Sequence, residues 1–352
     1  MNSLESLLVA CLGRIETFRM LRLMHIPVQL STKKDDVNNH QVTRAEIAYA
    51  LNVMLFRDLL ERVPEGKAYT EDAMHSGRKV FFDHGAVRTV HIPQSGQLPI
   101  GETAITRFLA PLGYQLNEVY PLPRLKMTGR AYFHADFPEQ MPQFFVSELH
   151  VDQFSPAFQQ AASRVVATSH DPLDITALAL LQQLQEAQTL EFDAAVFLLQ
   201  SLVRSFDRQH AIPTLDDYEI LLKESQEMAW ISTEGNAFNH VTDRVPDLSA
   251  LAEEQKALGR SIKPNIEVAA RGTMRQTAYR AAEVERVFRT EKGCVVRRVP
   301  GSFYEFISRD AIINPNNPLG EKVLDLKFDS GNATAIFKMT STEKPEKISS
   351  AN

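Results

Sequence analysis

The alternation of hydrophobic and polar residues predicts a chain that mixes helices with short strands. A helix is expected over residues 43–63, where Thr43 and Glu46 form a capping-box pattern and apolar residues follow at helical spacing. Residues 81–90 and 236–245 are rich in β-branched and aromatic residues and contain no proline, which predicts a strand in each. The two periodicities together indicate an α+β fold.

The strand at 81–90 opens a unit of five predicted elements. A short helix is expected over 102–112 and ends at Gly113. Three further strands are predicted at about 114–120, 130–135 and 144–151. The predicted order of this unit is β-α-β-β-β.

A helical segment separates this unit from a second one. Residues 156–228 lose the strand pattern and show apolar residues in steps of three and four, which predicts several helices that serve only as core. The second unit repeats the β-α-β-β-β order, with its first strand at 236–245 and its helix at 248–258. Its remaining predicted strands are 265–270, much of 274–288, and the run around Glu305. The predicted organisation is an N-terminal helical region (1–80), a first module (81–155), a helical insertion (156–230), a second module (231–339) and a flexible tail (340–352).

The two units also share an arrangement of polar residues. His84 and Arg88 are four residues apart on one predicted strand, and His240 and Arg244 repeat that spacing 156 residues later. An acid follows each histidine at a similar interval, Glu148 after 64 residues and Glu305 after 65. This repetition predicts two copies of one supersecondary unit that face each other. Their mixed sheet would curve around both histidines and one or both glutamates.

Composition and charge narrow the classes of function. The chain has 352 residues, 44% of them hydrophobic, and a net charge of −6 without a basic block, which argues against a nucleic-acid partner. Two cysteines cannot form a disulfide framework, so a cytoplasmic location is expected. The apolar runs are far shorter than the roughly 20 residues of a membrane span, so no membrane association is expected. For the first 30 residues, an amphipathic helix is favoured over a targeting peptide.

The paired histidines and glutamates are a candidate metal site. Two histidines and one carboxylate are the ligand set of non-haem Fe(II) centres that leave positions open for substrate and dioxygen. The same residues could hold Zn²⁺, Mn²⁺ or Ni²⁺, because affinity alone does not select iron. Glu148 stays open as an additional ligand or an ordinary strand carboxylate.

The two arginines are candidates for substrate binding. Arg88 and Arg244 each lie four residues from a histidine, about 13 Å along a strand, a distance suited to the far end of a small dicarboxylate. A guanidinium offers a carboxylate two parallel hydrogen bonds. The alternative is a structural ion pair, for example with Asp83 or Asp243, and this alternative is favoured for Arg244.

Four motifs follow one another along the chain. They are Asp-His-Gly-Ala-Val-Arg-Thr at 83–89, Phe-Asn-His-Val-Thr-Asp-Arg at 238–244, Arg-Gln-Thr-Ala-Tyr-Arg-Ala at 275–281 and Phe-Tyr-Glu-Phe-Ile at 303–307. Together they resemble the 2-oxoadipate dioxygenase/decarboxylase family, which is related to the vicinal-oxygen-chelate, or glyoxalase-like, superfamily. The resemblance implies that His84, His240 and Glu305 bind Fe(II) and that Arg88 holds substrate. It draws attention to Arg275 as an additional site residue. The implied reaction converts 2-oxoadipate and O₂ to 2-hydroxyglutarate and CO₂ in lysine degradation.

Two other functions remain open at the level of sequence. Glyoxalase-like relatives with a fourth protein ligand, which Glu148 could supply, carry out isomerase or lyase chemistry on a bound enediolate. Other relatives only bind a small molecule, although a pure binder has no use for three metal ligands. The sequence makes no prediction of the oligomeric state.

Overall fold

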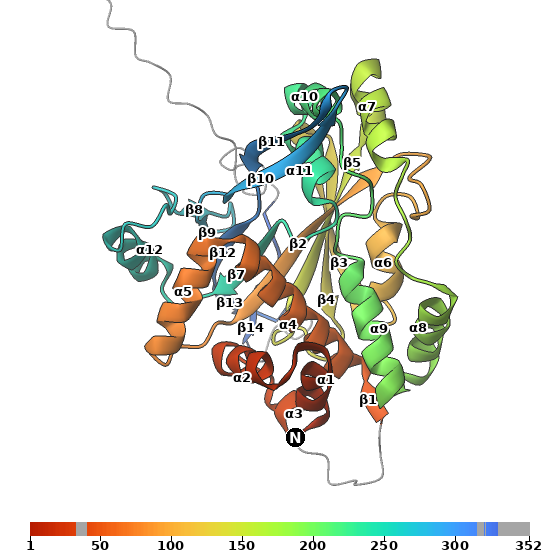
Figure 1. Cartoon of the computed structure of the whole chain (residues 1–352). Coiled ribbons are helices and arrows are strands. Elements are labelled where there is room, and N and C mark those ends of the chain that lie inside the picture. The colour runs from red at the N-terminus through yellow and green to blue at the C-terminus, as the bar shows by residue number, and fades with distance from the viewer. Residues whose placement is uncertain (33–40, 315–319, 321, 330–352) are drawn as a thin grey trace, which may run out of the picture.

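The computed structural model describes residues 1–32, 41–314, 320 and 322–329 (Figure 1). The helices are α1 (Ser3–Leu12), α2 (Arg14–Leu23), α3 (Val28–Ser31), α4 (Arg44–Arg62), α5 (Pro64–His75), α6 (Thr103–Leu109), α7 (Pro156–Val166), α8 (Ile175–Ala187), α9 (Phe192–Arg204), α10 (Leu215–Glu224), α11 (Gln226–Glu234) and α12 (Leu248–Ala257). The strands are β1 (Gln41–Thr43), β2 (Phe82–His91), β3 (Tyr114–Leu122), β4 (Met127–His134), β5 (Gln143–His150), β6 (Thr189–Glu191), β7 (His240–Arg244), β8 (Glu267–Val268), β9 (Met274–Ala278), β10 (Glu283–Thr290), β11 (Gly293–Pro300), β12 (Phe303–Arg309), β13 (Ala311–Ile313) and β14 (Lys322–Leu324). Two short 3₁₀ turns, Pro123–Leu125 and Val151–Gln153, complete the elements.

An eight-stranded sheet with the order β3-β4-β5-β2-β7-β12-β9-β8 forms the centre of the molecule. In each half the first strand lies parallel to the last, β2 beside β5 and β7 beside β12. The halves meet where β2 and β7 pair antiparallel, so one half mirrors the strand order of the other. This arrangement confirms the predicted α+β fold of two βαβββ modules in a mixed sheet.

The second module differs from its predicted strands in two places. The run 274–288 is interrupted, so that β9 joins the large sheet whereas β10 pairs with β11 in a separate two-stranded sheet. The strand expected at 265–270 is only the two residues of β8. The hairpin β10–β11 is therefore an addition between the third and fourth strands of the module.

One face of the sheet is covered by helices. The predicted capping box is present, since the Thr43 hydroxyl accepts from the Glu46 backbone N–H and the Glu46 carboxylate accepts from the Thr43 backbone N–H. It begins α4, whose Phe56 packs against Phe82 of β2 and Tyr304 of β12. On β12 the residue after Tyr304, Glu305, points to the other face. On β2 a β-bulge between Phe82 and His84 shifts the register, so His84 also points to that other face.

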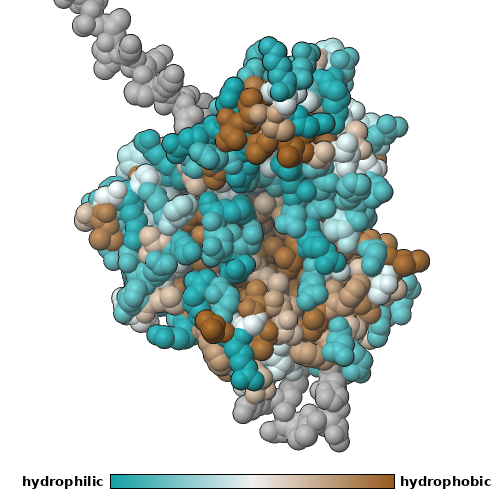
Figure 2. Space-filling view, viewed as in Figure 1, coloured by the Kyte–Doolittle hydropathy of each residue, from teal (hydrophilic) through white to brown (hydrophobic). Residues whose placement is uncertain are grey.

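The region between the modules is mainly helical, as predicted, with one exception. The short strand β6 pairs antiparallel with β1 near the N-terminus. The helices α7, α10 and α11 gather at the top of Figure 1 beside the hairpin β10–β11, where the ring of Phe288 packs on Tyr218 at 4.7 Å. Figure 2 shows apolar side chains over this hairpin and α10, where Leu222 and Val296 are exposed.

The N-terminal helices and the chain end complete the picture. Residues 14–23 form α2, an amphipathic helix that buries Thr17, Met20 and Leu23. Among the described residues, none of the helices is both long enough and apolar enough to cross a membrane. The predicted flexible tail, 340–352, lies outside the described residues.

Candidate metal centre

Three adjacent strands bring His84, His240 and Glu305 together on the face of the sheet opposite α4. The Nε2 atom of His84 lies 3.8 Å from Oε1 of Glu305, and the two imidazole rings are 5.6 Å apart. All three residues are buried, and each offers a ligand atom within 4.8 Å of the other two. The sheet register explains this grouping. Thr242 on β7 is paired with His84 on one side and Glu305 on the other, and its hydroxyl lies 3.1 Å from both.

The two imidazoles are oriented by neighbouring oxygen atoms. Nδ1 of His84 lies 2.8 Å from Oδ1 of Asp83, and Nδ1 of His240 lies 3.1 Å from Oδ1 of Asn239. Because these oxygens accept hydrogen bonds, each Nδ1 carries the proton and each Nε2 keeps its lone pair for a metal. Burial lowers the pKa of both histidines, which favours the neutral imidazole. These are the properties of metal-ligating histidines.

Glu305 completes a donor set that fits a divalent metal. Burial raises the pKa of its carboxyl group to about 8, and its Oε2 has no hydrogen-bond partner among the described residues. A cation would satisfy that oxygen and favour the charged carboxylate. Two neutral imidazoles and one carboxylate suit Fe(II) and other borderline divalent metals.

Asp83 links this group to a buried arginine, Arg309, and a partly buried one, Arg244. Its Oδ1 accepts from Arg309 at 2.9 Å, and its Oδ2 accepts from Arg244 at 2.8 Å. Burial alone would raise the pKa of Asp83, but the two guanidiniums hold it well below its usual range. Arg244 also stacks on Phe81. It is therefore part of an ion-pair network, as the structural alternative predicted, and not aimed at the metal group.

Arg88 lies on the same face of β2 as His84 and is 2% exposed. Its guanidinium forms an ion pair with Glu227 of α11 and lies over the ring of Trp230, 5.1 Å from the ring centre. Burial lowers the pKa of Arg88, although Glu227 opposes that shift. Glu227 lies in the segment for which the sequence predicted only structural helices. The sequence pattern did not indicate this contact, because a carboxylate on a helix does not show which strand it faces.

Glu148 is not brought to the metal group. Gln143 pairs with His84, and Glu148 lies an odd number of residues further along β5, so it points to the opposite face. There it lies near His91 and His150 and pairs with Arg130 at 3.1 Å. The structure thus removes the geometric basis for a fourth ligand at Glu148.

Two further residues show that the motifs alone do not identify which side chains lie beside the metal group. Arg275 forms an exposed ion pair with Asp310 at 3.0 Å and takes no part in the metal group. Phe328, which no motif indicated, packs its ring against His84 at 4.7 Å and also contacts Tyr120. It belongs to the segment after β14, which returns over the site.

The match to known proteins extends over most of this architecture. A family model for 2-oxoadipate dioxygenase/decarboxylase matches residues 46–325, a range that holds all three members of the metal group. The chain belongs to this enzyme family. A curated sequence of the same name agrees with the assignment, and solved structures share the fold.

The relatives of this family member come from plants and bacteria. The rice 2-oxoadipate dioxygenase/decarboxylase is 23% identical over 81% of this chain and 76% of its own length. A protein from Ralstonia eutropha JMP134, described as glyoxalase superfamily, is 51% identical with a TM-score of 0.86, over 93% of this chain and 98% of that one. The rice hydroxyglutarate synthase in complex with 2-oxoadipate is 22% identical with a TM-score of 0.63, over 85% of this chain and 93% of that one. This last likeness supports the fold.

Proposed function

We propose that this family member is an Fe(II)-dependent dioxygenase that converts 2-oxoadipate and O₂ to 2-hydroxyglutarate and CO₂. The observation that carries the proposal is the buried group of His84, His240 and Glu305, with two oriented imidazoles and a carboxylate oxygen that has no hydrogen-bond partner in the described part of the chain. Fe(II) in this group would bind a 2-oxo acid and activate dioxygen. Other divalent metals fit the same donors.

The protein residues would position the acid and shield it from water. Arg88 lies four residues from His84 on the same face, so its guanidinium is placed to meet the distal carboxylate of a dicarboxylic 2-oxo acid. Phe328 covers His84, which would keep bulk water from the reacting end. Asp83 and Asn239 would hold the two imidazole rings in their ligating orientation.

The relatives support the choice of substrate. Hydroxyglutarate synthases from rice and Pseudomonas putida have been solved in complex with 2-oxoadipate. Isomerase or lyase chemistry, the alternative that relied on Glu148, has less support because that residue faces the other side of the sheet. Participation in lysine degradation and a cytoplasmic location follow from the proposal as further predictions.

Oxygen consumption tests this function directly. We expect protein reconstituted anaerobically with Fe(II) to consume one O₂ for each CO₂ and each 2-hydroxyglutarate formed, measured with an oxygen electrode and mass spectrometry. His240→Ala should lose both the metal and the oxygen uptake, whereas His75→Ala, at an exposed histidine on α5, should keep both. Wild-type protein that binds Fe(II) and 2-oxoadipate but returns the acid unchanged would contradict the proposal.

A further inference from the structure

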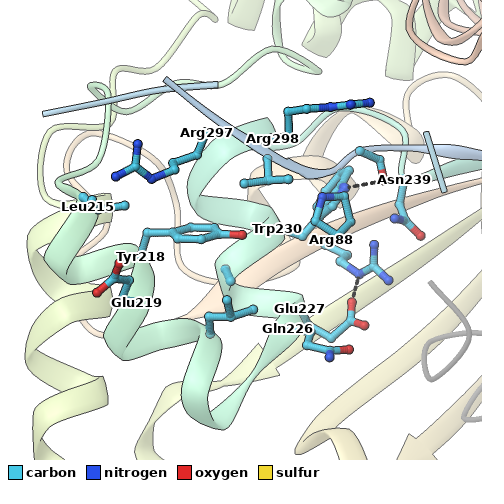
Figure 3. A pocket seen from close by; sticks show the side chains of 15 residues that line it. Arg88, Leu215, Tyr218, Glu219, Gln226, Glu227, Trp230, Asn239, Arg297 and Arg298 are labelled. Atoms are coloured by element: carbon cyan, nitrogen blue, oxygen red, sulfur yellow. Dashed lines mark hydrogen bonds and ion pairs between the residues drawn. The ribbon is translucent and has the colours of Figure 1, made fainter. Parts of the chain in front are cut away.

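A cavity of about 280 Å³ lies beside Arg88, between α10, α11 and the hairpin β10–β11 (Figure 3). Arg88 and Asn239 line it, and Tyr218 and Trp230 supply aromatic walls. Asn239 precedes the proposed metal ligand His240 and hydrogen-bonds to its ring. The cavity therefore borders a neighbour of His240, whereas His84, His240 and Glu305 are not among its described lining residues.

The charge of Arg88 is already compensated at this point. Glu227 forms an ion pair with the guanidinium, and the two side chains are 6% and 2% exposed. Glu227 lies in the first turn of α11, where Ser225 caps the helix by accepting from the Met228 backbone N–H. The partial positive charge of a helix N-terminus favours an acid there. The carboxylate is thus built into the wall of the cavity.

Burial also changes the protonation equilibrium of Glu227. It raises the pKa of Glu227, although Arg88 opposes that shift. The other charged side chains that line the cavity are Glu219 on α10 and Arg297 and Arg298 on β11, and all three are exposed. Water screens exposed charges, so Glu227 is the dominant anion for a group that approaches Arg88.

We propose that Glu227 is a specificity-determining residue, which sets the preference of this enzyme between 2-oxo acids with a distal carboxylate and 2-oxo acids with an uncharged distal amide. The inference rests on the proposed function, in which the acid's distal end meets Arg88. Arg88 and Glu227 together carry no net charge. A distal carboxylate therefore adds an uncompensated negative charge to a buried site, and Glu227 must move away or take up a proton. A distal amide adds no charge and can both donate to Glu227 and accept from Arg88.

Removal of the Glu227 charge should shift this preference towards the distal carboxylate. In Glu227→Gln the Arg88 charge loses the Glu227 carboxylate, so a distal carboxylate of the ligand can take its place as counter-ion. We expect the ratio of affinities, 2-oxoadipate over its distal monoamide, to rise by about tenfold or more, as for other charge-assisted hydrogen bonds in buried sites. Because the two acids share the same 2-oxo end, changes at the metal cancel in this ratio.

The ratio is measured by calorimetry on Fe(II)-loaded protein without oxygen, so that binding is observed without turnover. Asp216→Asn on the neighbouring helix α10 removes an exposed charge and should leave the ratio as in wild type. Arg88→Gln combined with Glu227→Gln should abolish the gain. Glu227→Asp, which keeps the charge on a shorter side chain, should shift the ratio in the same direction but less, and it serves if Glu227→Gln does not fold.

The outcomes separate this inference from the proposed function. An unchanged ratio in folded Glu227→Gln, with 2-oxoadipate still bound and oxidised by wild type, would overturn the role of Glu227 alone. Wild-type protein that binds neither acid would overturn both proposals. A ratio that rises equally in Asp216→Asn would assign the effect to overall charge and would also overturn the role of Glu227.

Discussion

At the scale of single residues, the orientation of the metal group depends on side chains that do not themselves face a metal. Asp83 accepts hydrogen bonds from Arg309 and Arg244 and orients His84, so one carboxylate compensates two cations and fixes one imidazole. A buried carboxylate is costly alone, but here it is fully paired. The same carboxylate therefore contributes both to stability and to metal affinity.

Replacement of Asp83 tests that dual role. Asp83→Asn keeps the size of the side chain but removes the counter-ion of the buried Arg309 and the partly buried Arg244, so we expect the free energy of unfolding to fall by about 3–5 kcal/mol. We also expect metal affinity to fall by about 10- to 100-fold, as for other residues that orient a ligating histidine. Urea unfolding of the metal-free protein and a metal titration measure the two effects.

Asp310→Asn is the matched control, because Asp310 also pairs with an arginine but on the surface. Exposed ion pairs contribute little to stability, so this variant should unfold like wild type and bind metal normally. If both variants changed stability equally, the Asp83 network would be no stronger than a surface pair. That result would contradict the role of the Asp83 network in orienting His84.

At the scale of elements, a second buried acid joins helix α5 to the central strands. Oδ2 of Asp243 on β7 accepts from the Tyr69 hydroxyl of α5 at 2.7 Å, and Oδ1 accepts from the Phe81 backbone N–H at 2.9 Å. Burial raises the pKa of Asp243 to about 7 despite these hydrogen bonds. The contact between α5 and the sheet is consequently sensitive to pH.

The sign of this pH dependence follows from the raised pKa of Asp243. Between about pH 4 and 7 the folded protein binds more protons at Asp243 than the unfolded chain does, so stability falls as pH rises. We expect Asp243→Asn to remove that part of the slope, on the order of a few kcal/mol across the interval. Chemical unfolding at several pH values measures it. The exposed Asp216→Asn should keep the wild-type slope, and an Asp243→Asn slope equal to wild type would contradict the assignment.

Elements with a strong local pattern could be predicted from the sequence, whereas those defined by a distant partner could not. Thr43 and Glu46 mark the start of α4 by local chemistry alone, and the structure contains that capping box. The run 274–288 has strand character throughout, but its break depends on pairing. Met274–Ala278 pairs with β12, and Glu283–Thr290 pairs with β11. Local strand propensity does not determine which strand each segment pairs with.

At the scale of the whole molecule, the same distinction separates the predicted from the unpredicted parts of the site. His84 and His240 could be grouped from their repeated spacing, because the two modules pair through β2 and β7. The same spacing pointed equally to Glu148 and Glu305, and only the family resemblance selected Glu305. Glu227 and Phe328 come from the helical insertion and from the segment after β14, which have no counterpart in that repeat. Their contacts with Arg88 and His84 depend on how distant segments pack. No sequence spacing reports that packing.

The candidate metal group also joins the two modules, because His84 belongs to the first module and His240 and Glu305 belong to the second. A ligand that binds only the folded state stabilises it, by about 2.7 kcal/mol when its free concentration is 100 times the Kd. We therefore expect Fe(II), added anaerobically at that excess, to raise the free energy of wild-type unfolding by about this amount. His84→Ala should lose most of the increase because one of the proposed ligands is missing. His75→Ala, at an exposed side chain on α5, should retain the increase. Denaturant unfolding with and without metal makes the comparison.

An equal increase in all three proteins would place the metal elsewhere on the chain, and no increase in wild type would contradict a metal centre shared by the two modules.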